Sequence, residues 1–313
     1  MSTDTRSVDV REVVLRDGLQ LEAPIPLEAK LAILDAVSRT GVRRVEVTSF
    51  VSPSAVPALA DAEQVAAALH RWPDLRFSAL VAGHGGARRA VAAGVPDLEY
   101  VISASDGHSL ANSARTTDEA VAATRDIAAL AHGAGGICEA IVAVAWDCPF
   151  DGRTPVARTV DVARRAVDLG ADRLCLGDTI GTVVPARLVE VVEAVRDACP
   201  GTDVGVHLHD TRGAGIACVL AAVQIGVTSL DASTGGLGGC PFAPGASGNI
   251  ATEEVVHLLE GSGFTTGLDL TRVLQAAAVV EEAVGHALPS RLHRAGGPSR
   301  PRPRPVAQGS RSS

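Results

Sequence analysis

Aromatic and lysine side chains are scarce in this chain of 313 residues. The sequence has one Tyr, two Trp and five Phe, and only one of its 28 Lys and Arg residues, Lys30, is a lysine. Because Lys30 lies in an expected helix and not at the end of a strand, Schiff-base chemistry is not expected. Ala, Val, Leu and Gly dominate instead, which suits closely packed helices and buried parallel strands better than a β-sandwich.

Paired cysteines and long apolar segments are also missing. The six cysteines are scattered without a C-x-x-C pair, so neither a zinc ribbon nor a disulfide framework is indicated. No apolar run is long enough for a membrane span, and residues 1–10 resemble neither a signal peptide nor a transit helix. We therefore expect a cytoplasmic protein in a reducing compartment, with no membrane partner.

Basic residues are scarce relative to acidic ones over most of the chain. The formal net charge is −8, and residues 291–313 contain six arginines and no acidic residue. Residues 1–290 therefore carry 22 basic and 36 acidic side chains, a balance of −14. A body with that charge is not expected to bind nucleic acid. Residues 288–313 have too few apolar side chains to fold, so we predict a disordered basic tail there.

Short β-branched runs alternate with Ala-rich amphipathic stretches through most of the chain. There are eight of each, and the helix-like stretches place apolar residues three or four positions apart. The strand-like runs are residues 8–15, 43–50, 76–81, 98–104, 139–146, 173–177, 203–209 and 229–232. The helix-like stretches lie near residues 27–40, 57–70, 84–93, 117–132, 155–169, 185–198, 213–225 and 251–261.

This strict alternation predicts an α/β protein with a parallel (β/α)8 barrel, or TIM barrel, whose working site lies at the C-terminal ends of the strands. A doubly wound open sheet is the alternative. A further apolar helix over residues 270–285 is expected to pack against the barrel or against a partner subunit. We therefore predict one barrel domain over residues 1–287, followed by the tail.

Residues 234–249 form a segment rich in glycine and proline around a single thiol, Cys240, and a single amide, Asn249. This composition excludes a helix or a central strand. Glycine permits positive φ and close approach of the backbone to a ligand, and proline stiffens a loop. We interpret the segment as a mobile lid that carries a reactive group. An ordinary flexible surface turn is the alternative.

Polar side chains concentrate at the expected C-terminal ends of the strands, which a barrel brings to one mouth. His207 and His209 lie two residues apart on a strand, so both imidazoles face the same side and can share a metal ion. Asp17 lies on the next-but-one strand around a closed barrel, and Asn249 can add an amide oxygen. Two nitrogen and two oxygen ligands suit Mg²⁺ or Mn²⁺. The alternative is a pair of hydrogen-bonded core or rim histidines.

Charged and reactive groups beside these ligands indicate how the site would act. Arg16 is suited to stabilise a developing enolate or oxyanion. Glu46 lies in an apolar strand where an unpaired carboxylate would be costly, so we expect it to form an ion pair with Arg16. Glu12 is interpreted as another inward-facing acid, with a supporting or a proton-handling role. Cys240 could exchange a proton once its loop closes, and an ordinary loop cysteine is the alternative.

Five motifs stand out along the chain: RDGLQ (16–20), VEVTSFVSP (45–53), GDTIG (177–181), HLHDT (207–211) and GGLGGCPFAPGASGN (235–249). Together they resemble the motifs of hydroxymethylglutaryl-CoA lyase, one of the DRE-TIM metallolyases. The resemblance covers residues 8 to about 285 and implies the (β/α)8 fold derived above. The Cys-containing loop is its most specific part, because related Claisen condensing enzymes share an RDG and an HXH but not that loop.

The resemblance implies a role for each candidate residue. It implies that a divalent cation is bound by Asp17, His207, His209 and Asn249. It further implies that Arg16 stabilises the enolate of the leaving acetyl-CoA, that Glu46 completes an Asp-Arg-Glu constellation, and that Cys240 is a loop acid or base. Candidate contacts to an acyl-CoA substrate at the same mouth are Arg16, Gln20, Ser49, Ser105, Asn112, Asp178 and Thr179.

The implied reaction is a retro-Claisen cleavage of 3-hydroxy-3-methylglutaryl-CoA, or of a close 3-hydroxyacyl-CoA, to acetyl-CoA and acetoacetate. Leucine degradation and ketone-body formation are the pathways that the resemblance implies, and a homodimer is the expected assembly. The sequence departs from the family pattern at Leu21, at Arg212 and at residues 14–15 and 143–147. Within the last of these, Trp146 is bulky at an expected strand end where substrate would lie, which leaves another acyl group open.

Two other kinds of function stay open. A Claisen-type synthase that joins acetyl-CoA to a 2-oxo acid, or another metal-dependent aldolase, would share the architecture. Such synthases usually show HXHND and an added regulatory domain, whereas this sequence has HLHDT at residues 207–211 and no predicted second domain. A catalytically silent barrel that serves as a binding module would not need the four candidate metal ligands to converge.

Overall fold

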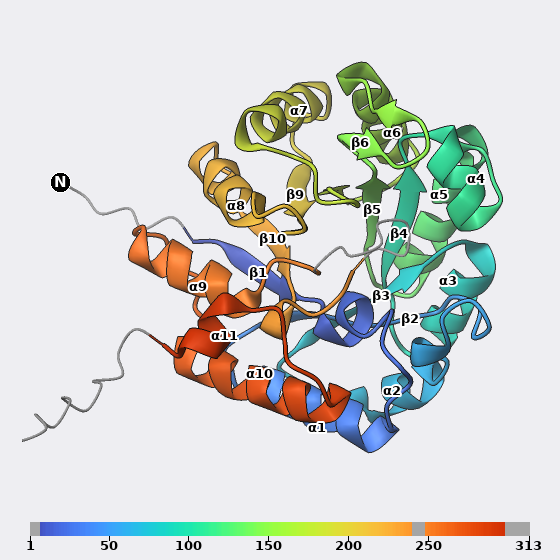
Figure 1. Cartoon of the computed structure of the whole chain (residues 1–313). Coiled ribbons are helices and arrows are strands. Elements are labelled where there is room, and N and C mark those ends of the chain that lie inside the picture. Colours follow the sequence, from blue (N-terminus) through green and yellow to red (C-terminus); the bar gives the residue numbers. More distant parts are fainter. Residues whose placement is uncertain (1–6, 240–247, 298–313) are drawn as a thin grey trace, which may run out of the picture.

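The computed structural model describes residues 7–239 and 248–297. Within these residues, eight parallel strands close a barrel in the order β1-β10-β9-β8-β5-β4-β3-β2 (Figure 1). The barrel strands are β1 (Asp9–Glu12), β2 (Arg44–Ser49), β3 (Arg76–Val81), β4 (Asp97–Ser103), β5 (Cys138–Ala143), β8 (Arg173–Gly177), β9 (Asp203–His207) and β10 (Ser229–Ala232). The predicted (β/α)8 barrel is therefore confirmed, and the open sheet is excluded.

Helices cover the outside of the barrel (Figure 1). Those of the described residues are α1 (Leu27–Ser38), α2 (Ala62–Ala68), α3 (His84–Ala92), α4 (Asp106–Ser113), α5 (Thr117–Gly133), α6 (Val156–Asp168), α7 (Pro185–Ala198), α8 (Gly215–Gln224), α9 (Thr252–Gly261), α10 (Leu270–Val284) and α11 (Arg291–Ala295). The expected extra helix is α10, and it packs against α1 of the barrel. A small antiparallel pair, β6 (Asp147–Cys148) and β7 (Gly152–Arg153), follows β5.

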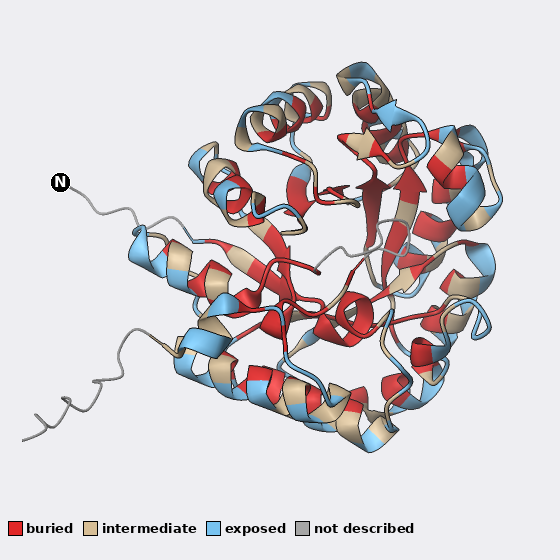
Figure 2. Cartoon of the chain, viewed as in Figure 1, coloured by how far each residue is buried: buried red, intermediate tan, exposed pale blue. Residues whose placement is uncertain are grey.

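The core has two layers, one inside the barrel and one between the strands and the helices (Figure 2). Successive side chains of a strand face these two layers in turn. On β5, Ala140 and Val142 are fully buried under the helices, whereas Ile141 and Ala143 face into the mouth of the barrel. Burial of each large aliphatic side chain contributes roughly 1.5–3 kcal/mol, so the outer layer supplies most of the hydrophobic stabilisation.

The chain after β1 departs from the expected strand over residues 8–15. The strand ends at Glu12, and Val14–Gly18 form a π-helical turn. Its backbone hydrogen bonds join residues that are five positions apart. Gly18 N donates to Val13 O at 3.1 Å, and Leu19 N donates to Val14 O at 2.9 Å. This wide turn buries both Arg16 and Asp17 at the barrel mouth, although they are consecutive in the sequence.

Two further segments differ from the sequence-based expectation. Helix α4 was not predicted, because residues 106–113 are mostly small or polar. Disorder was predicted from residue 288 onward, but residues 288–297 pack on the barrel. Leu288 is buried, and Ser290 N donates to Gly235 O at 3.0 Å before α11 begins. Residues 298–313 lie outside the described part of the chain.

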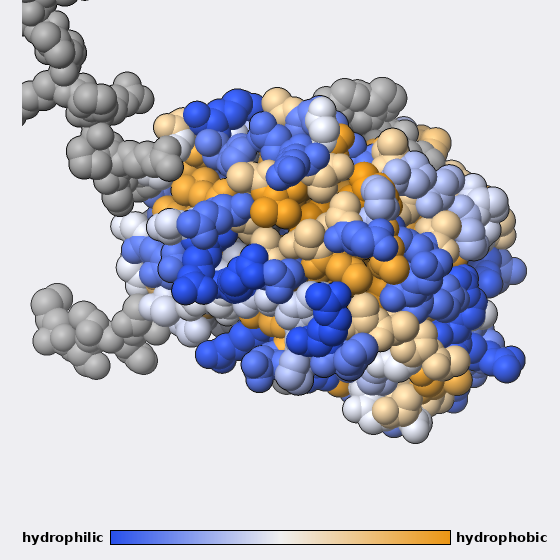
Figure 3. Space-filling view, turned by 90° about the horizontal axis from the view of Figure 1, so that it is seen from below, coloured by the Kyte–Doolittle hydropathy of each residue, from blue (hydrophilic) through white to orange (hydrophobic). Residues whose placement is uncertain are grey.

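The outer surface is mixed in character. Figure 3 looks at the side that carries α1 and α10, and hydrophilic residues cover most of it while hydrophobic ones gather near its middle. Among the described residues, the large hydrophobic side chains that are most exposed are Leu21, Leu110, Phe150 and Val184. None of the described helices combines the length and the apolar character needed to cross a bilayer.

Candidate metal centre at the barrel mouth

Asp17, His207 and His209 come together at the C-terminal end of the barrel, as predicted. Each is buried, and one potential ligand atom from each lies within 4.8 Å of the others. Asp17 Oδ2 is 3.8 Å from His207 Nε2 and 3.7 Å from His209 Nε2. These separations are too long for hydrogen bonds and leave room for an ion between the three side chains.

Each histidine is held by its other ring nitrogen. His207 Nδ1 lies 3.1 Å from Asp231 Oδ2, and His209 Nδ1 lies 2.8 Å from the backbone oxygen of Asp178. When Nδ1 donates to such an acceptor, Nε2 keeps its lone pair and can bind a cation. Both imidazoles therefore present the ligand nitrogen to Asp17.

Asn249 completes the set, and Leu237 and Gly238 lie close to its amide. Asn249 Nδ2 donates to Asp17 Oδ2 at 2.7 Å and to Leu237 O at 3.1 Å. Gly238 has φ of 117°, and a Cβ there would lie 2.5 Å from Asn249 Nδ2 and 2.9 Å from Asp17 O. Only glycine fits this close approach of the segment to both residues.

The donor atoms fit a divalent cation. Asn249 Oδ1 and His209 Nε2 are buried and have no hydrogen-bond partner within the part of the chain that the structure describes. Buried polar atoms without a partner are costly, so their convergence with a carboxylate indicates a ligand that satisfies them. Two imidazole nitrogens, one carboxylate oxygen and one amide oxygen suit a cation such as Mg²⁺ or Mn²⁺.

Arg16 and Glu46 form the ion pair predicted from the sequence. Arg16 Nη2 lies 2.7 Å from Glu46 Oε2, and its Nη1 contacts Asp17. Burial alone would lower the pKa of Arg16, but the charges of Asp17 and Glu46 hold it above the ordinary value. Burial raises the pKa of Glu46, and Arg16 opposes that shift. The guanidinium is therefore fixed as a permanent cation beside the proposed ligands.

The environment of Asp17 keeps it ionised. Burial alone would raise the pKa of Asp17, but the charge of Arg16 and the two neighbouring imidazoles hold it below the ordinary range. Burial lowers the pKa of His209, but the neighbouring carboxylate of Asp17 outweighs this effect and raises it. The same carboxylate charge would favour a metal cation at this position.

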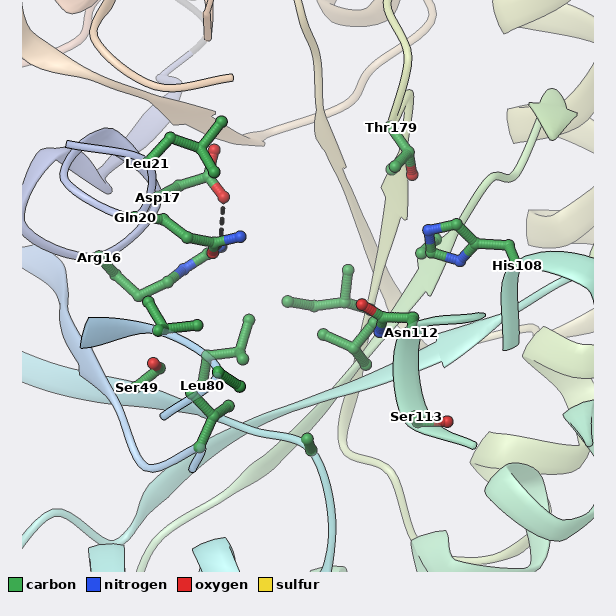
Figure 4. Close-up of a pocket in the computed structure, with 18 of the residues that line it drawn as sticks. Arg16, Asp17, Gln20, Leu21, Ser49, Leu80, His108, Asn112, Ser113 and Thr179 are labelled. Carbon is green, nitrogen blue, oxygen red and sulfur yellow. Dashed lines mark hydrogen bonds and ion pairs between the residues drawn. The ribbon is translucent and has the colours of Figure 1, made fainter. Parts of the chain in front are cut away.

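A pocket of about 500 Å³ opens beside these residues, a size typical of small-molecule sites. Figure 4 shows Arg16, Asp17 and Gln20 on one wall and Asn112 and Thr179 across from them. Of the predicted site residues, those that line the pocket are Arg16, Asp17, Gln20, Ser49, Asn112, Thr179, His207 and His209. Asn249 does not line this pocket, but it donates to Asp17, which does.

His108 is a pocket residue that sequence reasoning missed. It lies in the first turn of α4, lines the pocket, and its Nδ1 is 2.7 Å from Ser103 Oγ. Burial lowers the pKa of His108 to about 4, so the ring is neutral near pH 7. The one available signal was Ser105, a helix-capping residue type three positions before it.

Glu12 does not face the barrel interior, and that expectation is wrong. Arg11 occupies the interior face of β1, so the next side chain points to the outer layer. There the Glu12 carboxyl accepts four hydrogen bonds, from the backbone of Val14 and Thr234 and from the hydroxyls of Thr234 and Thr252. Burial nevertheless raises the pKa of Glu12 to about 7. The residue ties β1 to the start of α9.

Two predicted substrate contacts have other partners. Ser105 is the N-cap of α4, and its hydroxyl contacts Cys148 and Asp151. The Asp178 carboxylate accepts from the backbone of Thr182 at 3.0 Å and Val183 at 3.3 Å, away from the pocket wall. The Ser105 hydroxyl therefore caps the start of α4, and the Asp178 carboxylate stabilises the turn that follows β8. Asp178 still serves the centre, because its carbonyl orients His209.

Trp146 does not reach the pocket either. It is 0% exposed, and its indole N–H donates to Arg187 O of α7 at 3.1 Å. The expectation that its bulk alters the substrate end of the pocket is therefore wrong. The predicted proton-handling residue Cys240 lies outside the described residues.

Known proteins resemble this chain over nearly its full length. The sequence model of the HMGL-like family matches residues 7–280. The hydroxymethylglutaryl-CoA lyase YngG of Bacillus subtilis is 37% identical over 287 residues, which cover 91% of this chain and 96% of that protein. The (R)-citramalyl-CoA lyase of Chloroflexus aurantiacus is 38% identical over 301 residues, which cover 93% of this chain and 95% of that protein.

Solved structures agree with the sequence comparison. An HMG-CoA lyase from Acinetobacter baumannii, in complex with coenzyme A and 3-methylmalate, has a TM-score of 0.91 and 36% identity over 97% of this chain and 99% of that one. The Bacillus subtilis HMG-CoA lyase has a TM-score of 0.89 and 37% identity over 93% of this chain and 98% of that one. By its sequence and by its fold, this chain belongs to the HMGL-like family.

Proposed function

We propose that this protein is a metal-dependent carbon–carbon lyase that cleaves 3-hydroxy-3-methylglutaryl-CoA, or a close 3-hydroxyacyl-CoA, to acetyl-CoA and a keto acid. The observation that carries the proposal is the convergence of Asp17, His207, His209 and Asn249 beside Arg16 at the mouth of the pocket. Kinship with lyases of two acyl-CoA substrates supports the same reaction type.

The residues present divide the reaction between them. The four ligands would hold a divalent cation, preferably Mg²⁺ or Mn²⁺, and such a cation supplies Lewis-acid stabilisation of negative charge on oxygen. In the cleavage step the substrate hydroxyl loses its proton and becomes a carbonyl. The C2–C3 bond breaks, and its electron pair moves into the thioester to give the enolate of acetyl-CoA.

Arg16 is placed to stabilise that enolate. Its Nη atoms are held by Asp17 and Glu46, and its Nε has no partner among the described residues although it is buried. A preorganised cation of this kind favours the transition state because no solvent has to reorganise when charge develops. Protonation of the enolate at C2 ends the turnover, and we assign that proton to Cys240 on the glycine-rich loop.

The walls of the pocket offer polar groups to the rest of the substrate. Ser49, Asn112 and Thr179 supply neutral hydrogen-bonding groups, and Arg16 supplies the charge. His108 adds a neutral imidazole on the wall opposite the ligands. Neutral donors in fixed positions can orient a carboxylate or an amide without forming a new ion pair.

A second substrate deserves a direct comparison because the citramalyl-CoA lyase relative matches this chain as well as the hydroxymethylglutaryl-CoA lyases do. The two substrates differ by one methylene between the hydroxyl-bearing carbon and the carboxylate. The same bond cleavage would yield acetoacetate from one substrate and pyruvate from the other. Pocket contacts that discriminate one methylene are worth only about 1–3 kcal/mol, so both thioesters should be assayed.

The test is release of acetyl-CoA with acetoacetate or pyruvate from the two thioesters, after EDTA treatment and after addition of Mg²⁺ or Mn²⁺. Metal-dependent cleavage of either substrate is the expected result. Absence of cleavage of both by protein that demonstrably binds Mn²⁺ would refute the lyase proposal. The Asp17→Ala variant is the matched control for contaminating activity.

The compartment, the assembly and the pathway are part of the same proposal. We propose a cytoplasmic homodimer that acts in leucine degradation and ketone-body formation, as the family resemblance implies. Size-exclusion chromatography with light scattering tests the assembly. A monomer at micromolar concentration would contradict the dimer.

A further inference from the structure

A second layer of charged residues fills the barrel beneath the candidate metal centre. Arg11 of β1 lies at its middle and contacts three carboxylates. Its Nε is 2.8 Å from Asp231 Oδ1, its Nη2 is 2.9 Å from Glu139 Oε1, and its Nη1 contacts Glu99. All four side chains are buried. The carboxylates come from β10, β5 and β4, so Arg11 links four strands of the barrel.

This layer touches the metal centre at Asp231. Asp231 Oδ2 accepts from Arg11 Nη2 at 2.8 Å and lies 3.1 Å from His207 Nδ1. A carboxylate paired through both oxygens with a guanidinium is ionised and can only accept hydrogen bonds. His207 must therefore carry its proton on Nδ1, and its Nε2 lone pair faces Asp17.

The geometry also fixes the plane of the imidazole. Asp231 cannot rotate without breaking one of its two bonds to Arg11, each 2.8 Å long. Arg11 in turn cannot rotate without leaving Glu99 or Glu139. The orientation of His207 is thus set by side-chain ion pairs, whereas that of His209 is set by a backbone carbonyl.

We propose that Asp231, held by Arg11, is a positioning residue that fixes the tautomer and orientation of His207 toward the divalent cation. The inference rests on the proposed function only in requiring that the site bind such a cation. Loss of an outer partner of a metal-bound histidine typically costs about 10–100-fold in metal affinity. Asp231 should be worth an effect of that size.

The test is Mn²⁺ binding to the full chain without substrate, measured by electron paramagnetic resonance titration. We expect Asp231→Asn, which keeps the side-chain size, to raise the Kd for Mn²⁺ by about 10–100-fold. Arg11→Lys keeps one positive charge but loses the paired geometry and should give a smaller increase. The number of nitrogen atoms coupled to Mn²⁺ should fall from two to one in pulsed spectra of Asp231→Asn.

Arg44→Met is the matched control. Arg44 Nη2 is 3.2 Å from Glu139 Oε2 at the far side of the same layer. Its hydrogen bonds within the described residues go to Asp9, Ser229 and Glu139, and not to Asp231. It should lower stability without changing the Kd for Mn²⁺. A merely structural role for Asp231 predicts the same outcome for Asp231→Asn.

Several results would overturn the inference. One is a folded Asp231→Asn protein with a Kd within about threefold of wild type and two coupled nitrogens. If that variant does not fold, Arg11→Lys with wild-type affinity and both nitrogens would do so instead. Wild-type protein that binds no Mn²⁺ would also overturn it. Wild-type protein that binds Mn²⁺ but cleaves neither thioester refutes the lyase proposal and leaves the positioning role supported by the titrations.

Discussion

Arg11 and Arg16 lie five residues apart in the sequence, and both are buried among carboxylates, yet their surroundings differ. Arg11 belongs to a regular strand and is 1% exposed, and three carboxylates from other strands take up its donors. Arg16 belongs to the π-helical turn, is 5% exposed, lines the pocket and keeps Nε without a partner among the described residues.

Burial and charge alone therefore do not separate Arg11 from Arg16, for which we propose a catalytic role. The two guanidinium groups differ in whether a buried N–H donor lacks a partner among the described residues. Arg11 donates to three carboxylates inside the barrel, whereas Arg16 Nε has no partner among the described residues. The two buried carboxylates differ in a related way. Asp17 accepts from Arg16 and Asn249 but also faces two imidazole nitrogens across gaps of 3.7 and 3.8 Å, whereas His207 Nδ1 lies only 3.1 Å from Asp231 Oδ2.

The largest effect is expected where a group faces the ligand most directly. Asp17→Ala removes the carboxylate shared by the two imidazoles and by Asn249. Turnover should fall further than the about 10²–10³-fold typical of losing a single oxyanion donor, and bound metal should be lost with it. Parallel assays of metal content and acetyl-CoA release measure both. Metal at wild-type occupancy would contradict the ligand assignment.

Arg16→Met tests the leftover donor itself. We expect kcat to fall by about 10²–10³-fold while Mn²⁺ binding is kept, because the variant removes charge from the enolate site and no metal ligand. Loss of a nearby positive charge should, if anything, tighten cation binding. Steady-state kinetics and a Mn²⁺ titration on the same preparation provide the readout. Unchanged kcat would remove Arg16 from the chemistry.

Arg11→Met is the counterpart in the lower layer, and its main cost should be in stability. Removing one partner of a buried ion pair leaves uncompensated charge and typically costs about 3–5 kcal/mol. Three carboxylates would lose their shared partner here. Urea unfolding in EDTA separates this loss from any metal effect. A free energy of unfolding equal to that of wild type would break the comparison.

Glu12 should make stability depend on pH. Its pKa rises from the ordinary 4.5 to about 7 on folding, so the folded protein keeps a proton that the unfolded chain has released. Stabilisation from this group is complete below 4.5 and is lost as pH rises through about 7, a change of about 3 kcal/mol at most. Glu12→Gln should flatten this part of the urea midpoint between pH 5 and pH 8. If the urea midpoints of wild type and Glu12→Gln changed with pH in the same way, Glu12 would not be the source of the pH dependence.

Arg291→Ala should have the smallest effect and sharpens the contrast from outside the core. Arg291 also meets two carboxylates, Asp210 at 2.7 Å and Glu254 at 3.4 Å, but its side chain is 63% exposed. Surface ion pairs contribute about 0–1 kcal/mol and are screened by salt. Thermal unfolding at low and high salt provides the measurement. A loss matching that of Arg11→Met would show that burial is not what makes the difference.

The barrel and the convergence of Asp17, His207 and His209 could be predicted because each depends on a local pattern. The alternation of β-branched runs with amphipathic stretches predicted the eight β-α units. The two-residue spacing of His207 and His209 predicted that both rings lie on one face of the strand. Asn249 was predicted at the same site, and its amide lies against Asp17. Helix α4 was not predicted because a short polar helix has no apolar periodicity. His108, which lies on this helix and lines the pocket, was missed for the same reason.

The remaining errors come from backbone irregularities that composition does not reveal. Glu12 was assigned to the interior, but Arg11 occupies that face of the strand. The run expected to continue to Trp146 ends at Ala143, and Val144 has φ of 51°, a strained value for a β-branched residue. Beyond that point strand alternation no longer says which way a side chain faces. The layer around Arg11 was invisible because its members are single charges on four strands, which only the register brings together.

Closure of the barrel through β1 and β10 has a consequence for how the protein acquires its activity. Asp17 and Asn249 are separated by 232 residues, and Arg11 and Asp231 by 220. Such distant pairings form late, because the entropy of closing a long loop must be overcome first. A nascent chain would therefore complete the proposed cation site only after Asn249 has been synthesised and the ring has closed. A cation held by the proposed ligands would join the turn after β1 to the end of β9 and to Asn249, and would so stabilise the closed barrel over the open one.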